Sequence, residues 1–178
     1  NIAALTASNI AAGVMLTNFT GAFERNRIYN IWNKSTGTSP SNPVAAGIYS
    51  RFHSNAAVYN NMISLGNDTS DTQYLGVLVL GVGSNTHNYV YNSISITGVS
   101  NGSSSSFGFA RGEDTTITTN QSPVLRNNIL FVNRTGTAAN YPIASRGTAA
   151  SFGWNSDFNL LFNTDTAKIG FWDAAGYN

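Results

Sequence analysis

The chain has 178 residues, a length that allows one domain with its own hydrophobic core. Only 10% of the residues are charged and the formal net charge is +1, so the charge pattern does not indicate nucleic acid or an anionic membrane as a partner. Cysteine is absent, which excludes disulfides and thiolate metal sites, and no apolar run is long enough for a membrane-spanning helix.

Short runs with strand character follow one another from the N-terminus. Residues 1–12 are rich in alanine and are interpreted as a strand in preference to a capping helix. Beyond them each period holds two β-prone runs: one begins with a glycine, as in residues 47–50, and the other surrounds an asparagine, as in residues 59–65. The glycine-led runs start at Gly47, Gly76, Gly108 and Gly170, with Pro142 in the equivalent place.

Segments rich in Gly, Ser, Asn, Asp and Pro separate these runs, as turns require. They occupy residues 36–43, 66–72, 98–106 and 133–140. No stretch holds a helical period over three turns. The sequence therefore predicts an all-β protein.

One asparagine per period is the most informative feature of the chain. Each is followed two positions later by Ile or Leu, and the asparagines recur 31–36 residues apart. They are Asn26, Asn61, Asn92, Asn128 and Asn159, and the apolar residues that follow them are Ile28, Ile63, Ile94, Leu130 and Leu161. A period in this range with one strand signature per period indicates a stacked-repeat architecture.

The repeat predicts a right-handed parallel β-helix of about five to six coils. Each strand would pair with its copy one coil away, so like residues would lie on top of one another. The apolar residues would form an aliphatic core ladder. The asparagines would form a second, structural ladder at a corner that uses a left-handed backbone and side-chain amide bonds. A β-sandwich explains the density of strands but not the constant spacing.

Several strings in the chain resemble the repeats of a known family. They include residues 47–52, 58–66, 91–98, 124–130 and 153–159. These resemble right-handed parallel β-helix repeats of long extracellular proteins that bacteria export by type IX secretion, over about residues 13–172. The resemblance implies a solenoid outside the cell or at the bacterial cell surface. The family includes adhesins, surface proteins and polysaccharide-cleaving enzymes, so it implies no single reaction.

Candidate chemical sites are sparse. Arg51, Arg111 and Arg146 each lie three or four residues into a glycine-led run, so stacking could align them into a ligand-binding stripe for carboxylates or sulfates, although Leu80 or Gly81 interrupts it. Asp68 and Asp71 share a loop and are weak candidates for a Ca²⁺ site, because too few oxygen ligands accompany them. No residues are predicted to be catalytic, and no cofactor is expected.

These features favour a non-catalytic extracellular structural or adhesive module. Residues 1–178 are expected to form a single β-helix domain, as a fragment or module of a longer chain. Its expected partners are further copies stacked end to end, in a filament or surface layer, or another extracellular protein. The alternative is a carbohydrate-binding or polysaccharide-cleaving domain, a lyase or hydrolase, on the same fold.

Overall fold

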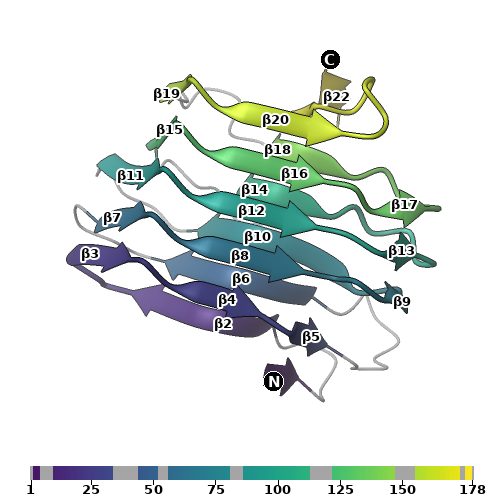
Figure 1. The fold of residues 1–178 in the computed structure, drawn as a ribbon, viewed down its shortest axis with the longest axis horizontal. Coiled ribbons are helices and arrows are strands. Elements are labelled where there is room, and N and C mark those ends of the chain that lie inside the picture. Colours follow the sequence, from purple (N-terminus) through teal and green to yellow (C-terminus); the bar gives the residue numbers. More distant parts are fainter. Residues whose placement is uncertain are drawn as a thin grey trace.

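The strands of this protein wind into a stack of coils (Figure 1). The computed structural model describes residues 2–4, 10–33, 44–51, 56–80, 86–112, 122–146, 155–172 and 175–177. The regular secondary structure in these ranges consists of β-strands alone. The parallel β-solenoid class predicted from the repeats is confirmed. The winding amounts to about four turns, fewer than the five to six predicted.

Four sheets run along the stack, and each takes one strand from successive coils. The back sheet consists of β2 (Ile10–Thr17), β6 (Val44–Arg51), β10 (Gln73–Leu80), β14 (Phe107–Arg111), β18 (Tyr141–Ser145), β21 (Gly170–Trp172) and β22 (Ala175–Tyr177). The side sheet consists of β3 (Gly21–Glu24), β7 (Ala56–Tyr59), β11 (Thr86–Val90), β15 (Ser122–Arg126) and β19 (Asn155–Asp157).

The front sheet, drawn nearest the reader in Figure 1, follows the side sheet in each coil. It consists of β4 (Arg27–Tyr29), β8 (Met62–Leu65), β12 (Ser93–Ile96), β16 (Ile129–Val132) and β20 (Leu160–Asn163). The corner sheet has three short strands, β9 (Thr69–Ser70), β13 (Val99–Ser100) and β17 (Thr135–Gly136). A separate pair joins β1 (Ile2–Ala4) to β5 (Ile31–Asn33).

Two features of the strand pattern differ from the sequence prediction. Each full coil has three main strands and a two-residue fourth, not two, because the asparagine-centred run breaks at Asn60 and Asn61 into β7 and β8. The last pairing is also different in kind: β22 runs antiparallel to β21, whereas every other pair in the described residues is parallel. The last described strand of the back sheet therefore does not continue the coil.

The core ladder forms along the inner face of the front sheet. Ile63 pairs with Ile28 on one side and Ile94 on the other, and the register continues through Leu130 to Leu161. The first four are at most 7% exposed and Leu161 is partly buried. Residues two apart in the sequence line the same face of a strand, which explains why an apolar residue follows each asparagine at that distance.

A column of glycines faces this ladder from the back sheet. Gly47 is level with Gly13 and Gly76, and the column continues to Gly108 and Pro142. A Cβ on Gly76 would lie 2.3 Å from both the Gly108 carbonyl oxygen and Ile94 Cγ2. Glycine is required here because the opposing sheet and the next coil approach the backbone so closely.

The glycine column has one exception to the predicted pattern. Gly170 pairs with Ile143 rather than Pro142, so its run is displaced by one residue. Ile48 and Val77, which directly follow Gly47 and Gly76, belong to the apolar cluster that contains the core ladder. The glycine and the residue after it therefore both face inward. The back sheet also carries a second apolar cluster on its other face, including Tyr49, Leu78 and Phe107. All eight residues of β10 are therefore buried.

Candidate functional site

The five recurrent asparagines stack into one hydrogen-bonded ladder at the corner between the side and front sheets. Within it, Asn61 donates from both its backbone N–H and its Nδ2 to Asn92 Oδ1, at 3.1 and 3.0 Å. The same pair of bonds joins the other steps at 2.9–3.1 Å. The remaining Nδ2 hydrogen reaches a backbone carbonyl, as from Asn92 to Val58 at 2.9 Å. The ladder thus satisfies buried polar groups of the backbone at every turn.

The left-handed backbone predicted for this corner occurs at the residue directly before each asparagine. Positive φ angles of 53–58° occur at Arg25, Asn60, Tyr91, Asn127 and Phe158, each directly before a ladder asparagine. These residues turn the chain between the side and front sheets and point their side chains away from the core. Two of them, Tyr91 and Phe158, are 59% and 77% exposed. The corner therefore combines a left-handed residue with the amide ladder, and the two features belong to successive residues.

A buried ion-pair network at the corner sheet was missed by sequence reasoning. The side chain of Arg134 is fully buried, and its guanidinium reaches Asp68 Oδ1 at 3.2 Å, two coils away. It also donates to the Ser70 carbonyl at 2.9 Å and lies 4.7 Å from the Tyr74 ring centroid. The Tyr74 hydroxyl donates to the other Asp68 oxygen at 2.7 Å. Gly98, in the rung between Asp68 and Arg134, has no side chain to block the contact.

This network determines what Asp68 can do. Both of its carboxylate oxygens already accept hydrogen bonds, from Arg134 and Tyr74, while Asp71 is exposed. A cation bound to Asp68 would lie beside the Arg134 guanidinium, and the repulsion between the two positive charges opposes such a site. Among the residues that the structure describes, no group of three or more His, Cys, Asp or Glu side chains could hold a metal ion.

The three arginines predicted to align do not form one stripe. Arg111 pairs with Val79 and Ser145, whereas Arg51 pairs with Leu80, so Arg111 is one residue out of register. Because side chains alternate between the faces of a strand, Arg111 points inward, is 1% exposed, and its burial lowers the pKa of its guanidinium. The prediction that Arg111 shares a surface with the other two is wrong.

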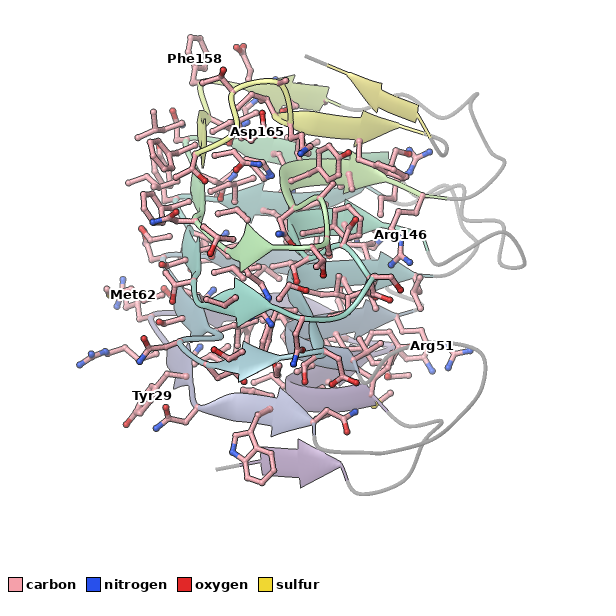
Figure 2. All side chains as sticks on the ribbon, turned by 90° about the vertical axis from the view of Figure 1, so that its right-hand side faces the viewer. Tyr29, Arg51, Met62, Arg146, Phe158 and Asp165 are labelled. Carbon is pink, nitrogen blue, oxygen red and sulfur yellow. The ribbon has the colours of Figure 1, made fainter. Side chains whose placement is uncertain are left out.

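Arg51 and Arg146 lie on the outer side of the back sheet, as Figure 2 shows. Leu80 separates their rungs, as the sequence predicted. Arg51 is partly exposed, but Arg146 is buried and its guanidinium lies 5.1 Å from the Phe107 ring centroid. Ligand binding by this pair stays a prediction.

The outer face of the front sheet concentrates the exposed apolar side chains of the described residues. Tyr29, Met62, Ile129, Leu160 and Phe162 are 41–62% exposed there, and Phe158 stands at the adjoining corner. In Figure 2, Tyr29, Met62 and Phe158 all point away from the core on this side. The Phe131 and Phe162 rings stack at 4.6 Å between centroids. Ser64, Ser93 and Ser95 separate the apolar residues of β4 and β8 from those of β16 and β20, so the face carries two apolar groups with a polar band between them.

A shallow groove crosses this face. It has a volume of about 540 Å³ and spans β4, β8, β12 and β16. Its lining combines Arg27, Tyr29 and Met62 with Ser64, Ser95 and Phe131. The Arg27 guanidinium lies 6.0 Å from the Tyr29 ring centroid, at the limit of a cation–π contact. The outer face of the front sheet, with this groove, is the candidate site.

The signal for this site was present in the sequence but was not used. Outward positions of the front strands are the residues directly before and after each core-ladder residue, such as Met62 and Ser64 on either side of Ile63. Because side chains alternate between the two faces of a strand, the core-ladder residues also identify the outward aromatic and aliphatic residues beside them.

Among the residues that the structure describes, no helix is long and apolar enough to cross a membrane. A scan against protein-family models, a search of curated proteins and a search of solved structures each gave no match to this chain.

Proposed function

We propose that the chain is a non-catalytic structural and adhesive β-solenoid module of the bacterial cell surface, from the repeat region of a protein exported by type IX secretion. The location and export route rest on the sequence resemblance alone. The observation that supports adhesion is the outer face of the front sheet, which presents Tyr29, Met62, Ile129, Leu160 and Phe162 on a regular array of parallel strands.

The rest of the molecule fits a role as a rigid support for that face. The ladder asparagines and the apolar core use their side chains to join coil to coil. The ion pair between the buried Arg134 and the partly exposed Asp68 extends over three coils and adds a long-range contact. A surface built on paired strands holds its side chains at fixed spacing, which lowers the ordering entropy lost when the face binds an extended partner.

Binding to defined films tests the adhesive role. Adsorption of the whole chain to methyl-terminated, cellulose and polyuronate films would be followed with a quartz crystal microbalance. We expect Met62→Lys to reduce adsorption to the methyl-terminated film, because a charge would replace an apolar side chain at the centre of the face. Met15→Lys is the matched control, since Met15 is also 57% exposed but belongs to the back sheet. Equal adsorption of Met62→Lys and Met15→Lys would refute adhesion through the front sheet.

The groove supports carbohydrate binding as a second candidate. Tyr29 and Phe131 offer ring faces to sugars, and Arg27, Ser64 and Ser95 offer hydrogen-bond donors. Calorimetric titration with neutral and uronic-acid oligosaccharides separates the two functions. A carbohydrate site predicts saturable binding that Tyr29→Ala abolishes and that Tyr91→Ala, at an equally exposed corner position, leaves unchanged.

A further inference from the structure

We propose that Asn101 is a site of spontaneous deamidation, at which the folded protein exchanges a side-chain amide for a carboxylate without an enzyme. This inference is independent of the proposed adhesive function. Asn101 and Gly102 form the only Asn-Gly pair in the 178 residues of the chain. The pair directly follows β13 in the corner sheet, at the right of Figure 1, and Asn101 is exposed to water.

The reaction uses a backbone nitrogen as its nucleophile. The Gly102 nitrogen attacks Cγ of Asn101 and forms a new C–N bond, and the bond from Cγ to Nδ2 breaks. The proton of the Gly102 nitrogen leaves with the former amide nitrogen as ammonia, and a five-membered succinimide ring remains. Water then opens the ring at either carbonyl. One opening gives aspartate, and the other gives isoaspartate, in which the backbone runs through the side-chain carbons. Water is the only co-reactant.

The structure leaves both reacting groups accessible. Glycine after the asparagine favours the attack, because no side chain crowds the nitrogen as it approaches Cγ. Within the residues that the structure describes, neither the Gly102 N–H nor the Asn101 side-chain amide has a hydrogen-bond partner. Neither residue belongs to a strand. The nucleophile and the amide that it attacks are therefore adjacent in the chain, and neither has a hydrogen bond that must break before the ring closes.

Hydrogen bonds protect the ladder asparagines from the same reaction. Asn92 precedes Ser93, a small residue that would also permit attack, but Asn92 is only 2% exposed. Its Nδ2 donates to Asn128 Oδ1 at 3.1 Å and to the Val58 carbonyl at 2.9 Å. The Ser93 N–H, the nucleophile at that position, donates to the Asn61 carbonyl at 2.9 Å. These buried bonds would have to break before a succinimide could form, so Asn92 is an internal control.

Exposure alone does not make an asparagine reactive. Asn155 is exposed and precedes a serine, but it lies in β19, which pairs with β15, and its Oδ1 accepts a hydrogen bond from Arg126 at 3.1 Å. The remaining exposed asparagines of the described chain precede residues larger than serine, as Asn88 precedes Tyr89. Asn101 alone among them combines exposure, a following glycine and a position outside the strands.

The bonds around the pair determine what the modification changes. The Asn101 N–H donates to the Ser70 carbonyl at 3.1 Å, and Thr137 Oγ1 donates to the Gly102 carbonyl at 2.7 Å. The pair is thus held to the coil before it and to the coil after it. Isoaspartate lengthens the backbone between these two bonds, so both cannot keep their geometry. The Ser70 carbonyl also accepts a hydrogen bond from the buried Arg134 at 2.9 Å, so isoaspartate would loosen the corner sheet beside the ion-pair network.

Peptide mapping by mass spectrometry tests the site in the whole chain. The folded protein and the same protein unfolded in guanidinium are incubated at mildly alkaline pH, because the attacking nitrogen must lose its proton. In the folded protein we expect the peptide with Asn101 to deamidate first, mainly to isoaspartate, while Asn92 stays intact. In the unfolded chain Asn92 should react as well. The proposal is overturned if folded Asn101 shows no product over the time that converts it completely in guanidinium, or if Asn92 or Asn155 reacts before it.

Gly102→Ala tests the role of the Gly102 nitrogen. Gly102 does not have a positive φ angle, so alanine can replace it without backbone strain. Its methyl group crowds the nucleophile while Asn101 stays in place. We expect deamidation of Asn101 in the folded variant to be several-fold slower than in the wild type. Equal rates in the two proteins would contradict attack by this nitrogen.

Denaturation of the modified protein measures the effect on the corner sheet. Anion exchange separates the deamidated fraction, because it carries one more negative charge than the starting protein. We expect the isoaspartate form to unfold at a lower denaturant concentration than the wild type. Asn101→Asp is the matched control, since it adds the same charge without lengthening the backbone, and its midpoint should follow the wild type. Equal midpoints for the isoaspartate form and Asn101→Asp would contradict the loosening of the corner sheet.

Discussion

Each inner ladder asparagine, such as Asn92, combines a donor and an acceptor at one buried position. Its Oδ1 accepts two hydrogen bonds from the preceding asparagine, and its Nδ2 donates to the next asparagine and to a carbonyl. An aspartate would supply no donor, and a serine hydroxyl would supply only one. The requirement for two acceptor sites and two donors in a short side chain explains why asparagine, and no other residue, recurs at this corner.

Removal of one amide from the middle of the ladder tests this account. In Asn92→Ala, the two donors of Asn61 lose their acceptor and the Val58 carbonyl loses its donor. We expect the free energy of unfolding to fall by about 3 kcal/mol, since each buried unsatisfied group costs about 1–3 kcal/mol. Asn88→Ala is the control, because Asn88 is exposed on the same coil and its change should be within about 0.5 kcal/mol. Equal denaturant midpoints for the two variants would contradict the role of the ladder.

Two buried tyrosines predict how stability changes in alkali. Burial raises the pKa of the Tyr74 and Tyr89 hydroxyls, and the bond from Tyr74 to the Asp68 carboxylate raises the pKa of Tyr74 further. In the unfolded chain both ionise near about pH 10. The folded state therefore holds these protons more tightly. The contribution of these two hydroxyls to the free energy of unfolding is fully present below about pH 10 and is lost as the pH rises above that value.

Denaturation at increasing pH, from about pH 8 to about pH 11, measures this loss. Tyr89→Phe should be less stable than the wild type at neutral pH, because Ser50 loses its 2.6 Å partner, but should lose less stability in alkali. Tyr91→Phe, at an exposed position, should follow the wild type. If Tyr89→Phe and the wild type fell in parallel, the Tyr89 hydroxyl would not be the group that titrates.

At the scale of the strand, the glycine column sets how closely the back sheet approaches the core ladder. Gly76→Ala would place a Cβ 2.3 Å from the Gly108 carbonyl oxygen and from Ile94 Cγ2, and neighbouring coils hold that carbonyl in place. We expect a loss of about 3 kcal/mol or more in the free energy of unfolding, because the strain cannot relax without shifting two strands.

Gly13→Ala is the matched comparison for that substitution. Its Cβ would also meet a carbonyl and an isoleucine, at 2.8 and 2.6 Å, but β2 is an edge strand with freedom to move. Its effect should be clearly smaller than that of Gly76→Ala. Chemical denaturation of both variants measures the difference, and a larger loss in Gly13→Ala would contradict the close-approach explanation.

The front and side strands show how much of the fold and of the candidate site could be predicted from the sequence. Asn61 and Ile63 were placed correctly because a solenoid repeats its neighbours at a fixed interval, which is visible in one chain. The break between β7 and β8 was missed, since Tyr59 and Met62 continue a strand-like composition across the corner. The Arg134–Asp68 contact could not be read from the period either. It joins residues 66 apart over two coils and depends on the missing side chain of Gly98.

For the whole molecule, a stack of coils predicts that stability depends on position along the axis. Apart from the Arg134–Asp68 contact, which skips one coil, the strands pair coil to adjacent coil, so an inner coil is held on two faces and an end coil on one. The burial of the core ladder already shows this: Ile63, Ile94 and Leu130 are 1–2% exposed, Ile28 is 7% exposed and Leu161 is only partly buried. Outer coils should therefore open more often than inner ones.

Hydrogen exchange followed by mass spectrometry measures that gradient. We expect amides of β8 and β12 to exchange most slowly and those of β4 and β20 to exchange fastest among the front strands, because each of these two end strands has a partner on one side only. In the same way, Asn159→Ala should lower the free energy of unfolding less than Asn92→Ala, since Asn159 is only partly buried and, within the described residues, its amide donates to no further ladder asparagine, whereas that of Asn92 donates to Asn128. Uniform protection across the five front strands at a concentration where the protein is monomeric would mean that the coils unfold as one unit.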